Sequence, residues 1–291
     1  HAMKKKYKAI FFDWDGTAVL SRKAPVEDIV KAMKPLLDRK IHLVIVSGTT
    51  MENIAGGKLA DYLTKEELDY LYLGLGRGAF NYRFAGGQEI VFSDLLPERK
   101  LLSDIHRIAF DIHMELLENY GLNTDIVFSR PNYCKIDLMV DNNRGDNLFM
   151  QENELDMLKE CLSSHGITDG LQGLLDISER AGKKYGIQVK PTCDAKYLEV
   201  GISSKSDNAD SIFTYLQEHY QIHPEDCSFW GDEYVGIEEG IYGSDSFMRT
   251  EKTKAGDFFD VSEVTGTRPD GVTQLGGGVN RFLDFLREQC E

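Results

Sequence analysis

The chain reads Lys8-Ala9-Ile10-Phe11-Phe12-Asp13-Trp14-Asp15-Gly16-Thr17 near its start. Residues 9–12 are all apolar, which is typical of a parallel strand that helices cover on both faces. Two aspartates and a glycine follow this strand. Open α/β sheets bind ligands at the carboxyl ends of their strands, so the paired carboxylates predict a metal ion or a proton transfer there. The structural alternative is two solvated acids that open an Asp-Gly turn.

The sequences before and after the middle of the chain alternate between strand and helix patterns. Short apolar runs predict strands at residues 42–46, 71–75 and 227–230. Apolar residues at helical spacing predict helices at residues 26–39, 207–220 and 280–289. This alternation is typical of an α/β fold, and it predicts a Rossmann-like core with a parallel sheet and right-handed crossovers.

The middle of the chain follows a different pattern. It predicts a hairpin at residues 82–92, helices at residues 101–120 and 152–163, and strands at residues 135–140 and 185–189. This mixture predicts an inserted α+β cap domain. We therefore expect a core domain made of residues 3–80 and 197–291, with a cap domain of residues 81–196 inserted between its two parts.

Composition restricts the compartment and the partners. The chain has 291 residues and a formal net charge of −15, which would on average repel nucleic acids and anionic membranes, so we expect a small-molecule partner. No apolar run is long enough to predict a transmembrane helix, and the first residues lack the apolar region of a signal peptide. The five cysteines are odd in number and widely spaced, which disfavours a disulfide framework and favours a reducing cytoplasm.

Polar residues stand at three further strand or helix ends, namely Ser47-Gly48, Lys205 and Asp232-Glu233. Each has an ordinary structural interpretation, as a helix cap, a surface lysine or a turn residue. Their shared place at element ends, together with the pair Asp13 and Asp15, indicates one common site at an edge of the sheet.

In this order, these residues resemble the four motifs of the haloacid dehalogenase superfamily of phosphotransferases. The insertion after the second motif resembles the large α+β cap of the Cof-type sugar-phosphate phosphatases. The resemblance implies that Asp13 is a nucleophile and that Asp15 is the general acid and base. It also implies that the Ser47 hydroxyl, the Gly48 amide and the Lys205 ammonium bind phosphate oxygens.

The resemblance further implies a Mg²⁺ ion held by oxygen ligands. The implied ligands are Asp13, Trp14, Asp15, Asp232 and Glu233. The chain departs from the family at this point, because the fourth motif usually continues as Gly-Asp-x-x-Asn-Asp. The acid that completes the site is therefore open between Glu233, Glu238 and Asp245, and Glu233 is preferred.

The resemblance implies a Mg²⁺-dependent phosphatase of small phosphorylated metabolites, above all sugar phosphates, that forms an aspartyl phosphate. The closest alternative is a phosphomutase for hexose phosphates, which uses the same intermediate. A third hypothesis is a non-catalytic sugar-phosphate sensor, although a sensor would not need a nucleophile and an acid together. No motif identifies the metabolite, and no pattern predicts the oligomeric state.

Overall fold

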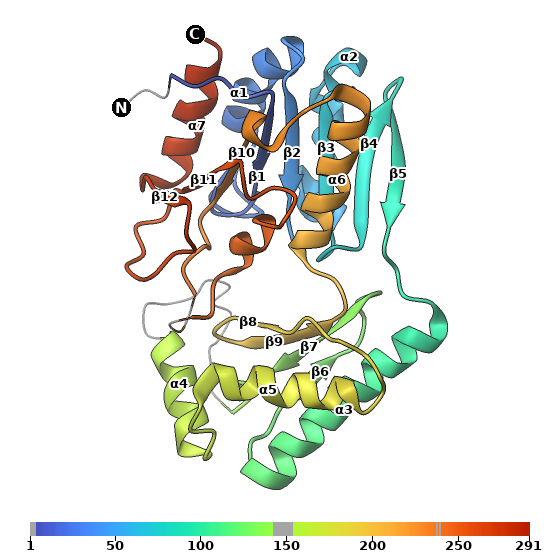
Figure 1. The fold of residues 1–291 in the computed structure, drawn as a ribbon, viewed down its shortest axis with the longest axis vertical. Helices are drawn as coiled ribbons and strands as arrows, with labels where there is room; N and C mark the ends of the chain where they lie inside the picture. Colours follow the sequence, from blue (N-terminus) through green and yellow to red (C-terminus); the bar gives the residue numbers. More distant parts are fainter. Residues whose placement is uncertain (1–3, 142–153, 237, 239) are drawn as a thin grey trace. The chain divides into compact units, whose positions relative to one another are not determined.

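The fold is that of a computed structural model, which describes residues 4–141, 154–236, 238 and 240–291. The chain folds into two compact units (Figure 1). The first contains residues 1–95 and 204–291, and the second contains residues 96–203. None of the described helices combines the length and the apolar character that a transmembrane span requires.

The first unit is built on an eight-stranded sheet with the order β12-β11-β10-β1-β2-β3-β4-β5. The strands from β12 to β3 are parallel to their neighbours, and β4 and β5 continue the sheet in antiparallel pairing. This confirms the predicted α/β core. The strands are β1 (Ala9–Phe12), β2 (His42–Val46), β3 (Leu71–Leu75), β4 (Phe80–Ala85), β5 (Gln88–Asp94), β10 (Cys227–Gly231), β11 (Asp257–Asp260) and β12 (Val272–Gln274).

Helices cover both faces of this sheet, because successive side chains of a strand point to opposite faces. Ile10 and Phe12 belong to the apolar core shared with α1 and α7, whereas Ala9 and Phe11 belong to the core shared with α6. The α-helices of the unit are α1 (Glu27–Asp38), α2 (Lys65–Leu68), α6 (Lys205–Tyr220) and α7 (Gly278–Gln289). Its 3₁₀ helices are η1 (Met51–Asn53), η2 (Ala55–Gly57), η3 (Leu59–Tyr62), η4 (Pro224–Asp226) and η5 (Ser244–Met248).

The hairpin predicted at residues 82–92 exists, but it belongs to the core sheet and not to the insertion. Its first strand, β4, pairs with β3, so that Phe80 lies opposite Leu75. The inserted unit therefore begins after residue 95 rather than at residue 81, and it ends at residue 203 rather than at residue 196. Local turn signals define a hairpin, but they do not define the strand with which it pairs.

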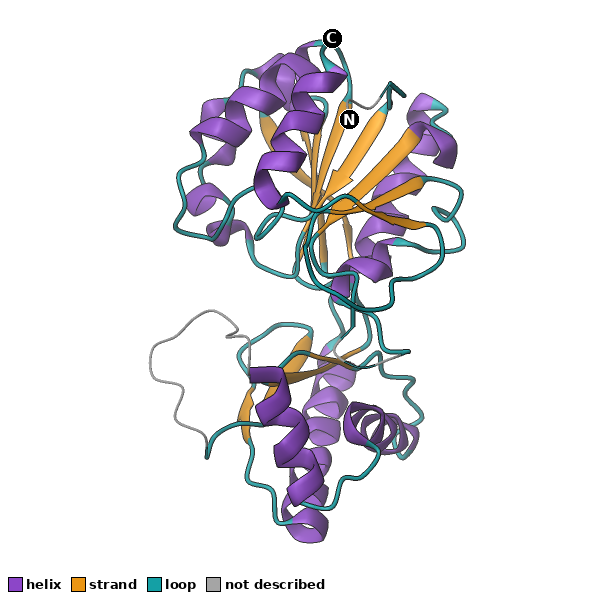
Figure 2. Ribbon diagram, turned by 90° about the vertical axis from the view of Figure 1, so that its left-hand side faces the viewer, coloured by secondary structure: helices purple, strands orange, loops and turns teal. Residues whose placement is uncertain are grey.

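The second unit packs three helices on one side of an antiparallel sheet with the order β6-β7-β9-β8 (Figure 2). Its elements are α3 (Arg99–Tyr120), β6 (Asp125–Val127), β7 (Tyr133–Asp137), α4 (Glu154–Ser164), α5 (Gly170–Lys183), β8 (Thr192–Cys193) and β9 (Tyr197–Gly201). The prediction of a strand at residues 185–189 is wrong, because the chain forms a turn at Gly186, where φ is +70°. The strand predicted at 135–140 begins and ends earlier, as β7. The predicted start of the helix at residue 152 lies outside the described residues.

His42, the first residue of β2, is a buried histidine with a predictable effect on stability. It is 4% exposed, its Nδ1 lies 3.1 Å from the Tyr72 hydroxyl, and the rings of Tyr70 and Tyr220 pack against it. Burial lowers the pKa of His42 to about 4, from an unfolded value of about 6.5. The unfolded chain therefore binds a proton first as the pH falls, so acid favours unfolding.

From these two pKa values, we expect protonation of His42 in the unfolded chain to lower the free energy of unfolding by about 2 kcal/mol between pH 7 and pH 5. The variant His42→Gln should lose this part of the pH dependence. Urea unfolding of both proteins at several pH values measures it. Buried acids titrate in the same pH range and also change the stability. The difference between the two proteins therefore isolates the contribution of His42. Parallel stability curves for the two proteins would contradict the prediction.

Candidate active site

The carboxyl ends of β1 and β10 bring two predicted residues to one edge of the core sheet. These strands are parallel neighbours, and Phe12 lies level with Trp230. Asp13 and Asp232, which follow shortly after, therefore leave the sheet next to each other, as the sequence predicts. Both residues belong to the first unit, as do Lys205 and Asp245.

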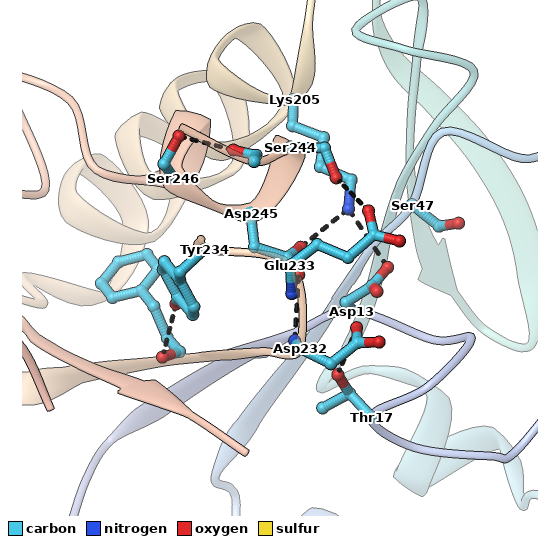
Figure 3. Close-up of polar contacts among 12 residues, drawn as sticks. Asp13, Thr17, Ser47, Lys205, Asp232, Glu233, Tyr234, Ser244, Asp245 and Ser246 are labelled. Atoms are coloured by element: carbon cyan, nitrogen blue, oxygen red, sulfur yellow. Dashed lines mark hydrogen bonds and ion pairs between the residues drawn. The ribbon is translucent and has the colours of Figure 1, made fainter. Parts of the chain in front are cut away.

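Lys205 is the first residue of α6 and contacts two of the acids at this edge. Its Nζ donates to Asp13 Oδ1 at 3.2 Å and to Asp245 Oδ1 at 2.8 Å (Figure 3). Ser204 holds the start of the helix, because its Oγ accepts the Ser206 N–H at 3.2 Å. Lys205 is 7% exposed, so its ammonium group depends on these carboxylates for compensation.

Three carboxylates form a compact group at this edge. One oxygen from each of Asp13, Asp232 and Asp245 lies within 4.8 Å of the others. Asp245, on η5, is fully buried, and its Oδ2 accepts the backbone N–H groups of Asp232 at 3.1 Å and of Glu233 at 2.8 Å. These backbone hydrogen bonds hold the Asp245 carboxylate in the group.

Glu233, which the sequence analysis preferred as the last metal ligand, is not one of these three carboxylates. Its side chain is exposed, and its Oε2 accepts the Ser244 hydroxyl at 2.8 Å. The remaining candidate, Glu238, lies in the loop that follows and forms an isolated bridge with Ile241. The structure therefore favours Asp245, which the sequence left open as one of three candidates.

Two glycines make room for the carboxylate group. Gly16 has a φ of +85°, and a Cβ on it would overlap the carboxylate of Asp232. A Cβ on Gly231 would overlap the side chain of Asp245. Both glycines of the Asp-x-Asp-Gly and Gly-Asp motifs are therefore needed for close approach.

Trp14 is one of the predicted metal ligands, but its carbonyl oxygen accepts hydrogen bonds from the backbone. Its carbonyl oxygen accepts the N–H groups of Thr17, Ala18 and Val19 at 3.3, 2.9 and 3.1 Å. Its ring is buried in the core. The turn after β1 directs the Trp14 carbonyl to the backbone, and its role as a metal ligand stays a prediction.

Asp15 lies outside the three-carboxylate group. Its Oδ2 is 3.8 Å from Arg22 Nε, and its Oδ1 is buried without a hydrogen-bond partner among the described residues. Burial raises the pKa of Asp15, although the charges of Arg22 and Lys205 oppose this shift. A carboxyl group with a raised pKa and an unoccupied oxygen is suited to proton transfer.

Ser47 and Gly48 follow β2, as predicted. Ser47 is 4% exposed, and its Oγ accepts the Thr49 N–H at 3.2 Å, which leaves the hydroxyl proton free to donate. Gly48 borders open space, because no atom would lie within 4 Å of a Cβ at this position. A small anionic group could approach the backbone here.

The electrostatics of the group show a shortage of positive charge. Burial, and then the charge of Asp245, raise the pKa of Asp13 to about 7, although Lys205 opposes the shift. Burial and the charges of Asp13 and Asp245 raise the pKa of Asp232 to about 10. Burial alone would lower the pKa of Lys205, but the surrounding carboxylates raise it above its ordinary value. One lysine therefore does not compensate the three acids.

A divalent cation fits this set of residues. The group offers carboxylate oxygens only, which Mg²⁺ and Ca²⁺ prefer, and it contains none of the histidine or cysteine ligands that are usual for zinc. A bound cation would also supply the positive charge that Lys205 alone does not provide.

The fold was compared with known proteins. No protein-family model and no curated protein sequence matches the chain. Among solved structures, the IMP-bound IMP-nucleotidase of Plasmodium falciparum is similar with a TM-score of 0.61 and 13% identity, over 98% of this chain and 66% of that one. The trehalose-6-phosphate phosphatase of Aspergillus fumigatus is similar with a TM-score of 0.54 and 13% identity, over 99% of this chain and 94% of that one.

The chain thus spans slightly less than two thirds of the nucleotidase and nearly the full length of the sugar-phosphate phosphatase. Both similarities are similarities of fold, because the sequence identities are low. They extend across both units. This protein therefore has the haloacid dehalogenase fold.

Proposed function

We propose that this protein is a phosphatase that hydrolyses small phosphomonoesters through an aspartyl phosphate on Asp13, with Mg²⁺ as its cofactor. One observation carries the proposal. A buried carboxylate at a strand end lies 3.2 Å from a buried ammonium group, within a group of acids that is short of positive charge. This arrangement suits the binding of a dianionic phosphoryl group next to a carboxylate nucleophile.

Binding of the phosphoryl group is assigned to Lys205, Ser47 and Gly48. The Lys205 ammonium compensates the charge of the phosphate oxygens, and the Ser47 hydroxyl and the Gly48 N–H donate to them. These groups hold phosphorus in line with a carboxylate oxygen of Asp13. Asp13 then attacks phosphorus, the bond to the leaving oxygen breaks, and the phosphoryl group is held as an aspartyl phosphate.

Proton transfer is assigned to Asp15. In the first step its carboxyl group donates a proton to the leaving oxygen, and in the second step it accepts a proton from the attacking water. Its raised pKa favours the protonated form that the first step requires.

Asp13, Asp232 and Asp245 would hold the Mg²⁺ ion. When bound, the ion neutralises the charge that otherwise repels an anionic nucleophile from a phosphate dianion. The proposed ligands differ from the sequence prediction, because Asp245 replaces Glu233, and Trp14 and Asp15 are not included.

Sugar phosphates are the proposed substrates. The two similar structures are named for a nucleotide and for a sugar phosphate, and both of these compounds carry a phosphate ester on a sugar. The cytoplasm is the proposed compartment, on the basis of the odd, widely spaced cysteines. A panel of phosphorylated metabolites, assayed for release of inorganic phosphate, tests the proposal, and no release from any member would contradict it.

A phosphomutase is the alternative for which the same site would serve. Incubation with a hexose 1-phosphate separates the two activities, because free phosphate indicates a phosphatase and a hexose 6-phosphate indicates a mutase. A non-catalytic sensor would give neither product.

Metal binding has its own test, which does not depend on turnover. We expect Mg²⁺ to raise the melting temperature, because it binds the folded protein and relieves repulsion between the carboxylates; at 100 times the Kd the gain is about 2.7 kcal/mol. Asp245→Asn should lose most of this increase, whereas Glu233→Gln should keep it. Thermal unfolding with MgCl₂, and with NaCl at the same ionic strength as a control, measures the effect. The opposite result for the two variants would return the metal role to Glu233.

A further inference from the structure

A groove in the second unit lies along one face of α3. Its volume is about 750 Å³, within the range of small-molecule sites. Arg99, Ser103, His106 and Phe110 line it at intervals of three or four residues, so they share one face of the helix. The buried face of α3 carries other residues, among them Ile105, Ile108 and Ile112. The groove side is therefore a separate surface and not part of the core.

Two aromatic rings are exposed at this groove. Phe110 is 52% exposed and Phe128, which follows β6, is 42% exposed. The ring of His106 lies 4.9 Å from that of Phe128 at an angle of 49°. Exposed phenylalanine rings gain free energy when a flat apolar group covers them, and aromatic groups do this well.

The polar groups of the lining point to an anion rather than to a neutral ligand. Arg99 has no ion-pair or hydrogen-bond partner among the described residues. Arg107 donates to Ser103 Oγ at 2.7 Å and to Asp104 at 3.2 Å. Asp111, the acid that lines the groove, is bound by the Tyr185 hydroxyl at 2.7 Å and by Lys184 at 3.3 Å, so its charge is compensated. Arg99 therefore remains free to pair with an anionic group in the groove.

We propose that this groove binds a planar aromatic molecule carrying a negatively charged group, the chemical class that includes nucleoside monophosphates. The ring would pack on Phe110 and Phe128, and the anionic group would pair with Arg99. Stacking on aromatic side chains is favourable for every nucleobase. The site is formed entirely by the second unit, and it is independent of the residues proposed for catalysis.

Isothermal titration of the full-length Asp13→Asn protein with AMP and GMP tests the proposal, since this background prevents hydrolysis. Adenosine, ribose 5-phosphate and inorganic phosphate are the comparison ligands. The groove variants are Phe110→Ala and Arg99→Gln, and Leu117→Ala is the matched control, because it is a 39% exposed residue of α3 outside the groove. Circular dichroism checks that each variant is folded.

We expect saturable binding of at least one nucleotide, with adenosine at least about tenfold weaker. Phe110→Ala should weaken binding by about tenfold, as removal of a stacking ring does. Arg99→Gln should weaken it by a similar factor, and Leu117→Ala should leave it unchanged. In the Asp13-containing protein, the groove variants should hydrolyse p-nitrophenyl phosphate at the unaltered rate, so the proposal can fail while the proposed function stands.

Three results would overturn the proposal. The first is no saturable binding of either nucleotide up to about 10 mM, which is weaker than a specific site allows. The second is equal binding by the two groove variants and the control. The third is a dimer in sedimentation that Phe110→Ala abolishes, because a second copy of the chain would then be the occupant.

Discussion

The variant Asp13→Asn should lose at least about 10⁴-fold of the phosphatase activity, because an amide cannot form the aspartyl phosphate and no other described carboxylate occupies its place. The fold should remain. Asp13 is a buried acid among other acids, so its replacement by a neutral amide relieves repulsion from Asp232 and Asp245. Without Mg²⁺, the melting temperature should therefore not fall below that of the unaltered protein.

Asp13→Glu is the matched control for this experiment. It keeps the negative charge and the type of metal ligand but moves the carboxylate by one methylene group, so it should also be inactive. Initial rates with a metabolite substrate, together with melting curves, give both results. An Asp13→Asn protein that is folded and keeps more than a few per cent of the activity would remove Asp13 from the role of nucleophile.

The variant Asp15→Asn should affect two substrates to different extents. A sugar alkoxide needs a proton as it leaves, so transfer of the phosphoryl group to Asp13 should slow by about 10² to 10⁴. p-Nitrophenolate leaves without a proton, so the same step should be much less affected. Breakdown of the aspartyl phosphate still needs a base for water, which asparagine cannot provide.

With p-nitrophenyl phosphate, Asp15→Asn should therefore show a burst of nitrophenolate followed by a slow steady state. Rapid mixing measures the burst, and mass spectrometry of the quenched protein measures the phosphate held on Asp13. Arg22→Gln serves as a control, because it removes the ion pair with Asp15 but keeps the carboxyl group. Equal slowing of both substrates, with no burst and no trapped phosphoenzyme, would remove Asp15 from proton transfer.

The sequence by itself determined the core of the fold and the central acids of the site. Apolar runs at residues 42–46 and 71–75 become β2 and β3 with the predicted bounds, because a strand buried on both faces needs a continuous apolar run. Asp13 and Asp232 could be placed together because parallel strands end at one edge of a sheet. This inference requires only the strand pattern and the position of each acid after it.

The tertiary structure alone decided which acid completes the carboxylate group. Glu233 is next to Asp232 in the sequence, but adjacent residues point in different directions, and its side chain is exposed. Asp245 reaches the group through a loop, and backbone hydrogen bonds from Asp232 and Glu233 hold it there. A loop path has no periodic sequence signal, so spacing could supply only candidates.

The sequence also did not predict which distant segments pair with each other. The hairpin of β4 and β5 has a clear local signal at Gly86-Gly87, yet its place in the core sheet depends on its contact with β3. The groove on α3 likewise required the structure, because Phe128 and Tyr185 reach it from other elements. Local patterns specify strands, turns and buried faces, whereas the contacts between them are decided by packing across the whole chain.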